Sequence, residues 1–133
     1  MQTLVIDGYN VIHAIPDIEG LLEESLEAAR IGLIRMVTEF KNSRKDVQRI
    51  FIVFDGKSEG PDQEVAVSEG ITAIYTPTGK EADNKILEII KDSDQPQSIT
   101  VISNDNFLYN NARSLGARIK TVRDFCRMFK NRC

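Results

Sequence analysis

The most constraining feature of this sequence is a repeated pairing of a short apolar run with an aspartate. Runs that are apolar throughout and stop abruptly are typical of strands buried on both faces, as in the middle of a parallel sheet. Each run is followed within three residues by the aspartate. The three pairs are residues 4–6 with Asp7, residues 50–54 with Asp55, and residues 98–102 with Asp105.

Parallel strands bring their carboxyl ends to one edge of the sheet, where ligands bind in open α/β folds. We therefore expect the three aspartates to lie close together. Carboxylates held close together repel one another unless a cation neutralises them, and Mg²⁺ and Mn²⁺ prefer oxygen ligands of this kind. The pattern predicts a metal site. The alternative is that Asp7 and Gly8 form an ordinary turn.

Alternating strand and helix patterns predict the fold class. We expect one α/β domain over residues 1–133, with three α/β/α layers and a mostly parallel central sheet of about five strands joined by right-handed crossovers. Residues 11–17 should lead into a loop, and residues 56–70 should form an irregular loop beside the site. The expected strands are residues 4–6, 50–54, 71–75, 99–102 and 118–121, and the expected helices are 19–41, 81–91, 105–115 and one beginning at Val122.

The expected helix at 81–91 carries a fourth candidate ligand. Asp83 lies three, four and seven residues before the apolar positions 86, 87 and 90, so it shares the buried stripe of the helix. A carboxylate there is costly unless it has a partner. Glu81 lies on another face and completes a Thr78-x-x-Glu81 capping box. We therefore assign Asp83 to the metal and Glu81 to a supporting role as a cap.

Charge is distributed unevenly along the chain. Residues 1–112 contain 10 basic and 19 acidic side chains, whereas residues 113–133 contain seven basic side chains and one acidic. A basic terminus beside an acidic pocket suits a ligand with a phosphate backbone. Candidate RNA-backbone contacts are Arg113, Lys120 and Arg123. The alternative is a solvated helix face with basic residues near its C-terminal end.

Other function classes find little support. No apolar run approaches the roughly 20 residues that cross a bilayer, and the N-terminus does not resemble a secretory signal, so we expect a cytoplasmic protein without a membrane partner. Cys126 and Cys133 have no zinc-binding spacing and are expected to be free thiols. His13 is the only histidine, so no Ser/His/Asp or Cys/His arrangement exists. An aspartyl-phosphate enzyme would need a second aspartate two residues after Asp7.

Several motifs together resemble one family. Their order resembles that of the NYN domain, the PIN-like nuclease family that includes YacP-type proteins. Asn104 and Asn106 depart from a pattern in which more acidic residues would strengthen a second metal site. The motifs are Asp7-Gly-Tyr-Asn10, Phe54-Asp55-Gly56, Ile74-Tyr-Thr76 followed by Glu81-Ala-Asp83, and Ser103-Asn104-Asp105.

The resemblance implies a PIN-like fold and metal-dependent cleavage of RNA. It implies that Asp7, Asp83 and Asp105 bind the metal. Asp55 matches the acid after the second strand, and Asn10 matches the adjacent polar residue. YacP-type proteins are endoribonucleases associated with translated messages, so the resemblance also implies RNA, and more distantly the ribosome or translated mRNA, as partners.

Two functions follow as hypotheses. The first is an endoribonuclease that hydrolyses RNA phosphodiester bonds with one or two Mg²⁺ or Mn²⁺ ions bound by the aspartates, with Ser103 and Asn104 in supporting roles. The second is a non-catalytic RNA- or protein-binding module on the same fold, because a fold alone does not determine function. Tyr9 and Tyr75 are candidates for stacking on a base, with a place in the core or pocket wall as the alternative.

Overall fold

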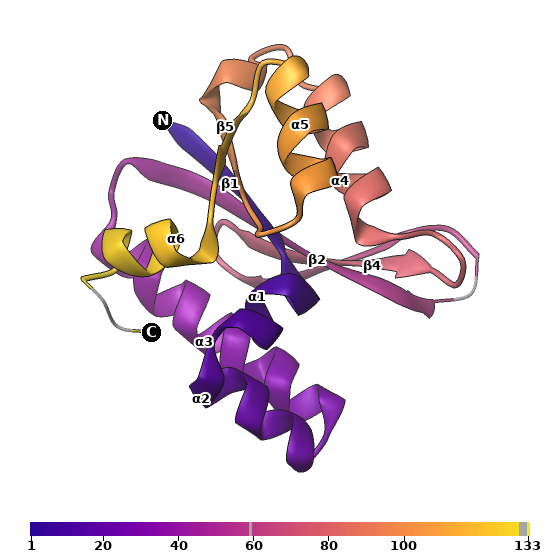
Figure 1. Ribbon diagram of the computed structural model, residues 1–133, viewed down its shortest axis with the longest axis vertical. Helices are drawn as coiled ribbons and strands as arrows, with labels where there is room; N and C mark the ends of the chain where they lie inside the picture. Colours follow the sequence, from indigo (N-terminus) through magenta and orange to yellow (C-terminus); the bar gives the residue numbers. More distant parts are fainter. Residues whose placement is uncertain (59, 131–132) are drawn as a thin grey trace.

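A computed structural model describes residues 1–58, 60–130 and 133. A six-stranded sheet runs through the molecule in the order β3-β4-β2-β1-β5-β6 (Figure 1). All neighbouring strands are parallel except β3, which pairs antiparallel with β4. The strands are β1 (Gln2–Asp7), β2 (Val47–Ser58), β3 (Gln63–Ser68), β4 (Ile71–Pro77), β5 (Ile99–Ile102) and β6 (Arg118–Lys120).

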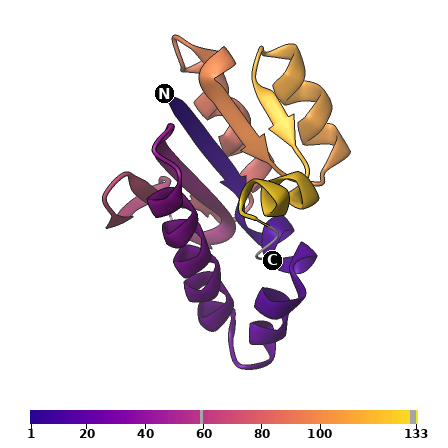
Figure 2. The same cartoon turned by 90° about the vertical axis from the view of Figure 1, so that its left-hand side faces the viewer.

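Helices cover both faces of the sheet (Figure 2). Helices α4 and α5 lie on one face, and α1, α3 and α6 lie on the other (Figure 1). None of the helices in the described parts of the chain is long and apolar enough to cross a membrane. The helices are α1 (Gly8–Ala14), α2 (Pro16–Glu19), α3 (Leu26–Ser43), α4 (Ala82–Lys91), α5 (Asn106–Ser114) and α6 (Val122–Met128), with 3₁₀ turns η1 (Gly20–Glu23) and η2 (Pro96–Ser98).

The central strand β1 shows why the layers form. Its side chains alternate, so Leu4 and Ile6 belong to the core beneath α3 and α6, whereas Val5 belongs to the core beneath α4 and α5. All three are fully buried. The three-layer α/β/α class is therefore confirmed. The first apolar run, which predicted a strand buried on both faces, lies in β1.

The sheet has one more strand than the five that we expected. Residues 56–70, predicted to be an irregular loop, contain the end of β2 and the edge strand β3. The strand was hard to find because its pattern is weak: it is largely exposed, and even Val65 keeps 46% of its surface in contact with solvent. An edge strand needs only one hydrogen-bonded neighbour and little buried apolar surface.

The segment between β1 and α3 also differs from the prediction. Residues 11–17, expected to lead into a loop, lie mostly in α1 and α2, and Val11 is fully buried. The long helix expected from residue 19 begins at Leu26 instead. Ser25 caps it, because its hydroxyl oxygen accepts a hydrogen bond from the backbone N–H of Ala28 at 2.9 Å.

The two cysteines were expected to be free thiols, and this prediction was wrong. Cys126 in α6 and Cys133 form a disulfide. After α6 the backbone turns at Lys130, which adopts a positive φ of 55°. The pattern of cysteines in sequence does not reveal such a turn, so their spacing of seven residues gave no sign of the pairing.

Gly8 is where the fold and the candidate site meet. It is the first residue of α1, so Asp7-Gly8 is a strand-to-helix junction rather than an ordinary turn. A Cβ atom at Gly8 would lie 2.5 Å from the ring of Phe54 and 2.9 Å from the carbonyl oxygen of Val53. Only glycine allows α1 to begin this close to β2.

We expect Gly8→Ala to destabilise the fold by about 1–3 kcal/mol, because the added methyl group overlaps Phe54 and the backbone of β2. Gly20→Ala is the matched control: nothing lies within 4 Å of its added Cβ, and its φ is −58°. This control should be neutral or slightly stabilising. Urea unfolding of both variants measures the difference, and equal free energies of unfolding would contradict this account of Gly8.

Candidate active site

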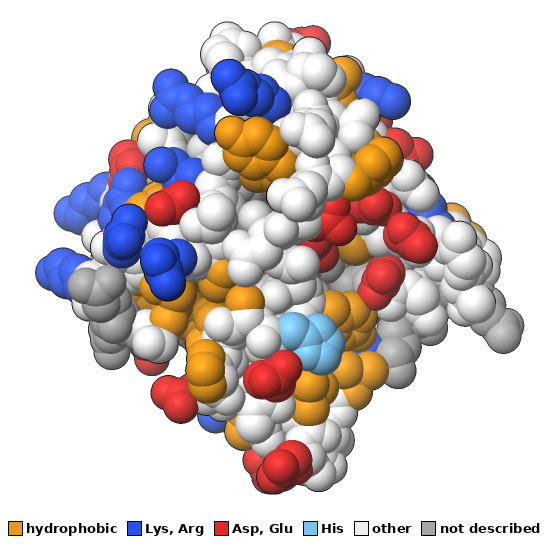
Figure 3. All heavy atoms as spheres, in the orientation of Figure 1, with side chains coloured by type: hydrophobic (Ala, Val, Ile, Leu, Met, Phe, Trp, Pro, Cys, Tyr) orange, Lys and Arg blue, Asp and Glu red, His pale blue; other side chains and the backbone are white. Residues whose placement is uncertain are grey.

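An acidic pocket of about 260 Å³ opens at the carboxyl edge of the sheet. Figure 3 shows a group of Asp and Glu side chains there, right of centre, with the single histidine just below it. The strands β1 and β2 and the starts of α4 and α5 each contribute a carboxylate. The pocket is lined by Asp7, Tyr9, Asn10, His13, Asp55, Glu81, Ala82, Asp83 and Asp105.

Asp7 is the last residue of the central strand β1. Its side chain is held by Ser103, the residue that follows β5. The hydroxyl of Ser103 donates a hydrogen bond to Oδ2 of Asp7 at 2.9 Å. The same Ser103 oxygen accepts one from the backbone N–H of Asp105 at 3.0 Å. Ser103 is 3% exposed. One buried hydroxyl therefore connects two of the predicted metal ligands.

The environment of Asp7 opposes its ionisation. The pKa of Asp7 is raised from 3.8 to about 6, and burial is the largest cause. The hydrogen bond from Ser103 lowers this pKa, whereas the negative charges of Asp105, Asp55 and Asp83 raise it. These three aspartates are therefore close enough to Asp7 to affect its ionisation. The strand pattern predicted that Asp55 and Asp105 would lie near Asp7, and the helix pattern added Asp83.

Asn10 fixes the loop that follows β5. Its side-chain oxygen accepts a hydrogen bond from the backbone N–H of Asn104 at 2.7 Å. The side-chain oxygen of Asn104 in turn accepts one from the N–H of Val122, at the start of α6, at 2.9 Å. Of these two residues, Asn10 lines the pocket, and Asn104 connects the loop to α6.

Asp105 and Asp55 reach the pocket from different local structures. Asp105 caps α5, because its Oδ1 accepts a hydrogen bond from the N–H of Leu108 at 2.9 Å, and this fixes its side chain at the pocket. Asp55 does not end its strand, since β2 continues to Ser58. Its place beside Asp7 follows from the pairing of β1 with β2, in which Asp7 lies opposite Val53.

Asp83 differs from the other carboxylates. It lies in the first turn of α4. Its Oδ1 atom is buried and has no hydrogen-bond partner in the described part of the chain. An unpartnered buried carboxylate oxygen is costly, and a bound cation or water would remove that cost. The expectation that Asp83 lies along the buried side of its helix therefore agrees with the structure.

Glu81 does not have the capping role that we predicted. It occupies the N-cap position of α4 itself and makes no side-chain cap hydrogen bond, so the box with Thr78 does not form. The helix begins at Ala82, three residues later than that pattern requires. Glu81 is exposed and lines the acidic pocket instead.

The donors in this pocket are chemically suited to a hard divalent cation. They are carboxylate and amide oxygens, and one of them, Oδ1 of Asp83, has no partner. Within residues 1–58, 60–130 and 133, however, no group of three or more His, Cys, Asp or Glu side chains is arranged to hold an ion. Among the described residues, the carboxylates therefore share the pocket without being arranged as a ligand shell.

The aromatic candidates lie partly in the pocket wall. The side chain of Arg30 is 8% exposed, donates a hydrogen bond from Nε to the hydroxyl of Tyr9 at 2.9 Å, and lies over the rings of Tyr9 and Tyr75. Tyr75 also stacks on Phe54. These contacts agree with a structural role for both tyrosines. His13 is paired with Glu19 at 3.1 Å.

The three predicted RNA-backbone contacts do not all lie in one place. Arg113 and Lys120 line a second groove together with Tyr109 and Arg118, two residues that the sequence reasoning missed. Arg123 is exposed on α6. One feature of the sequence could have drawn attention to Tyr109. It follows Asp105 by four residues and so lies on the same face of α5.

Comparison with known proteins agrees with this geometry. Residues 4–132 match the model of the YacP-like NYN domain, a family of PIN-like nuclease domains. The chain belongs to the YacP-like NYN domain family.

One curated relative and two similar crystal structures come from Bacillus subtilis. The uncharacterized protein YacP of strain 168 is 30% identical over 86 residues, which cover 65% of this chain and 49% of YacP. The crystal structure of a mutant of Rae1 (YacP) superposes with a TM-score of 0.77 at 26% identity, covering 98% of this chain and 76% of that one. A second Rae1 (YacP) crystal structure gives a TM-score of 0.78 at 24% identity, with 98% and 75% covered. The matched part of this chain thus spans about half the length of the curated relative.

We expect Asp7→Asn to make the metal-free protein more stable above about pH 6. In the folded state Asp7 loses its proton near pH 6, whereas in the unfolded chain it does so near 3.8. Between these values the folded state binds more protons, so its stability falls as the pH rises, by roughly 2–3 kcal/mol in all. The asparagine variant lacks this loss.

Thermal unfolding in EDTA measures this difference. The melting temperature of Asp7→Asn should exceed that of the unmodified protein at about pH 7.5, and the gap should close as the pH approaches 4. Asp17→Asn, at an exposed position of α2, is the matched control. A gap for Asp7→Asn that is the same at both pH values would contradict the raised pKa.

Proposed function

We propose that this protein is a metal-dependent endoribonuclease that hydrolyses RNA phosphodiester bonds at the acidic pocket. The observation that supports this most is the buried, unpartnered Oδ1 of Asp83 in a pocket shared with Asp7, Asp55 and Asp105. Family membership supports a nuclease. Association with the ribosome or translated mRNA, and a cytoplasmic location, stay expectations from the sequence.

In this proposal Asp7, Asp83 and Asp105 hold the first cation, and Asp55 completes its ligand shell or positions a second. Bound there, Mg²⁺ or Mn²⁺ lowers the pKa of a water molecule and stabilises charge on the scissile phosphate. Ser103 orients the carboxylate of Asp7 through its hydrogen bond. Each of these oxygen donors is one that hard divalent cations accept.

Asn10 acts as a donor toward the substrate. Its Oδ1 is already used by the N–H of Asn104. The amide Nδ2 therefore remains to donate a hydrogen bond to a phosphate oxygen or to the attacking water. The residues that line the pocket include no Lys or Arg, so the pocket itself offers no such side chain to a phosphate. Contacts to the RNA backbone consequently come from Arg113, Lys120 and Arg123, outside the pocket.

A non-catalytic RNA- or protein-binding module is the second candidate. One observation favours it: no group of three or more metal-binding side chains in the described residues is arranged to hold an ion. In that case the acidic pocket would serve only for contacts. The two candidates differ in whether a divalent cation binds and whether RNA is cut.

The first experiment is cleavage of a labelled single-stranded RNA with Mn²⁺, with EDTA, and with Asp7→Asn. We expect cutting that requires both the metal and Asp7, because Asp7 is the central carboxylate of the pocket. Calorimetric titration with Mn²⁺ accompanies it. Neither cutting nor Mn²⁺ binding by the unmodified protein would refute the nuclease proposal and favour the binding module.

Asp83→Asn tests the proposed role of the unpartnered oxygen. We expect a loss of Mn²⁺-dependent cleavage of about 100-fold or more, because the variant replaces a charged ligand by a neutral one. The melting temperature in EDTA should not fall, since the variant removes a negative charge from beside the other carboxylates of the pocket. Retention of full activity would remove Asp83 from the site.

Two other variants are matched to this one. Asp92→Asn makes the same change at the exposed C-terminal end of α4 and should leave cleavage unchanged. Glu81→Gln should reduce cleavage less than Asp83→Asn, because Glu81 is exposed and its charge is already stabilised by solvent. An equal loss for Glu81→Gln would make it a ligand of the same standing as Asp83.

A further inference from the structure

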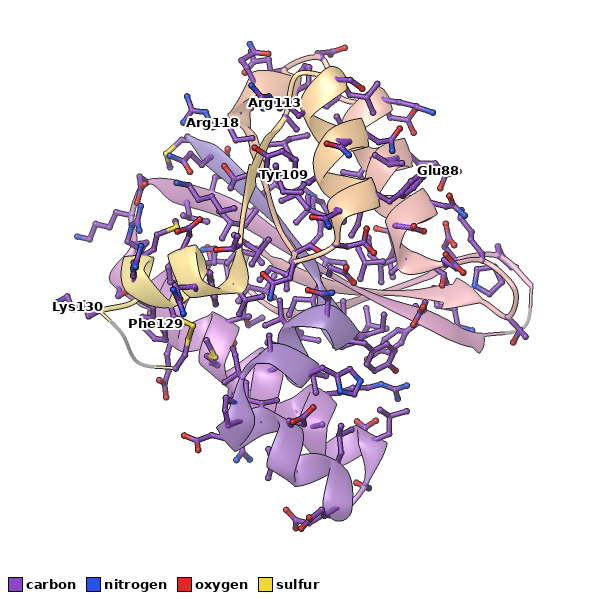
Figure 4. The ribbon with its side chains drawn as sticks, viewed as in Figure 1. Glu88, Tyr109, Arg113, Arg118, Phe129 and Lys130 are labelled. Atoms are coloured by element: carbon purple, nitrogen blue, oxygen red, sulfur yellow. A yellow bond between two sulfur atoms is a disulfide. The ribbon has the colours of Figure 1, made fainter. Side chains whose placement is uncertain are left out.

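A second groove, separate from the acidic pocket, lies between α5 and the edge strand β6. It has a volume of about 360 Å³. Figure 4 shows Tyr109, Arg113 and Arg118 together at this place, on α5 and at the start of β6. The groove is lined by Tyr109, Arg113, Ala117, Arg118, Ile119 and Lys120.

The lining of this groove combines an aromatic ring with positive charge. Tyr109 leaves 40% of its surface in contact with solvent, although it is a large side chain that burial would favour. Arg113 and Arg118 are exposed, and neither forms a salt bridge within the residues that the structure describes. Lys120 is partly buried and interacts electrostatically with Asp124. No acidic side chain lines the groove.

Helix α5 connects this groove to the acidic pocket. Asp105 caps the helix and lines the pocket, and Tyr109 and Arg113 follow at intervals of four residues. Residues at this spacing lie on one face, about 6 Å apart along the axis. Figure 3 shows both regions on one face of the molecule: many Lys and Arg side chains at the upper left, and the acidic group right of centre.

We propose that this groove binds an unpaired nucleotide of single-stranded RNA, with its base stacked on Tyr109 and its neighbouring phosphates on Arg113, Arg118 and Lys120. This inference rests on the proposed nuclease function and defines its substrate as unpaired RNA. The strand then runs along α5 toward the acidic pocket. An aromatic ring beside a positively charged track is the arrangement by which proteins hold single strands.

The aromatic ring decides between substrate classes. The bases of a duplex are stacked on one another, so a duplex could use the basic side chains but not Tyr109. An acidic peptide would likewise depend on charge alone. Dependence of binding on the ring of Tyr109 therefore distinguishes an unpaired strand from both.

The test is fluorescence anisotropy in EDTA with a labelled single-stranded RNA and with the same strand in a duplex. We expect Tyr109→Ala to weaken single-strand binding about tenfold and to leave duplex binding unchanged. Tyr109→Phe should retain most of the affinity, because the ring remains. The exposed position and the good helix propensity of alanine should preserve the melting temperature of Tyr109→Ala.

Phe107→Ala is the matched control. Phe107 lies on the same helix and is 54% exposed, but it does not line the groove, so its removal should not change the affinity. Arg113→Gln should weaken the binding of both RNAs. For the single strand it should lower the slope of log affinity against log salt concentration by about 0.7, the amount expected for one phosphate contact.

The outcomes separate this inference from the nuclease proposal, because binding in EDTA requires neither metal nor cleavage. Equal affinities of Tyr109→Ala and the unmodified protein for single-stranded RNA would overturn the groove assignment, whatever the cleavage assay shows. An equal loss for Phe107→Ala would also overturn it. Ring-dependent binding by a protein that neither binds Mn²⁺ nor cuts RNA would support the groove and refute the nuclease.

Discussion

The partly buried carboxylate of Asp7 is the group on which the rest of the site depends. It ends the central strand, and its burial beside three further aspartates raises its pKa to about 6. The fold accepts this cost because the position is fixed by packing: β1 is buried on both faces, and Gly8 allows α1 to begin against β2. A compensating contact, the hydrogen bond from Ser103, also connects Asp7 to the backbone of Asp105. The ends of β1 and β5 and the start of α5 are therefore joined through a single hydroxyl.

The other polar groups around the pocket divide into two kinds. Asn10, Asn104 and Asp105 each accept a backbone N–H, so they hold the loops and helix starts around the pocket. Asp83 has an oxygen without such a partner, although α4 fixes its position. Oδ1 of Asp62 is also buried without a hydrogen-bond partner, but Asp62 forms ion pairs with Lys80 and Lys85 and does not line the pocket. An unpaired buried oxygen inside the acidic pocket marks a place where a cation or water can bind. Asp83 thus differs from the polar groups of the first kind because no group in the described part of the chain donates a hydrogen bond to its Oδ1 atom.

The sequence predicted the parts of this structure that depend on strong local patterns. Continuous apolar runs identified the central strands, and a parallel sheet then placed Asp7, Asp55 and Asp105 together. It failed where the signal was weak or depended on distant geometry. The edge strand β3 is mostly exposed, so it lacks an apolar pattern. Glu81 fitted a capping box with Thr78, but α4 begins only after Glu81, so the box does not form. The disulfide of Cys126 with Cys133 follows a turn of the backbone after α6 that the sequence pattern did not predict.

Electrostatics gives a reason for two separate regions on one face. A pocket lined by carboxylates repels phosphates, so it cannot supply the affinity for an RNA chain by itself. Binding energy gained at a distance from the reacting bond can overcome this repulsion and bring the scissile phosphate to the pocket. The groove at Tyr109 has the opposite charge and lies about one helical turn from Asp105. Because α5 carries residues of both regions, the fold itself sets the distance between the proposed binding groove and the proposed cleavage site.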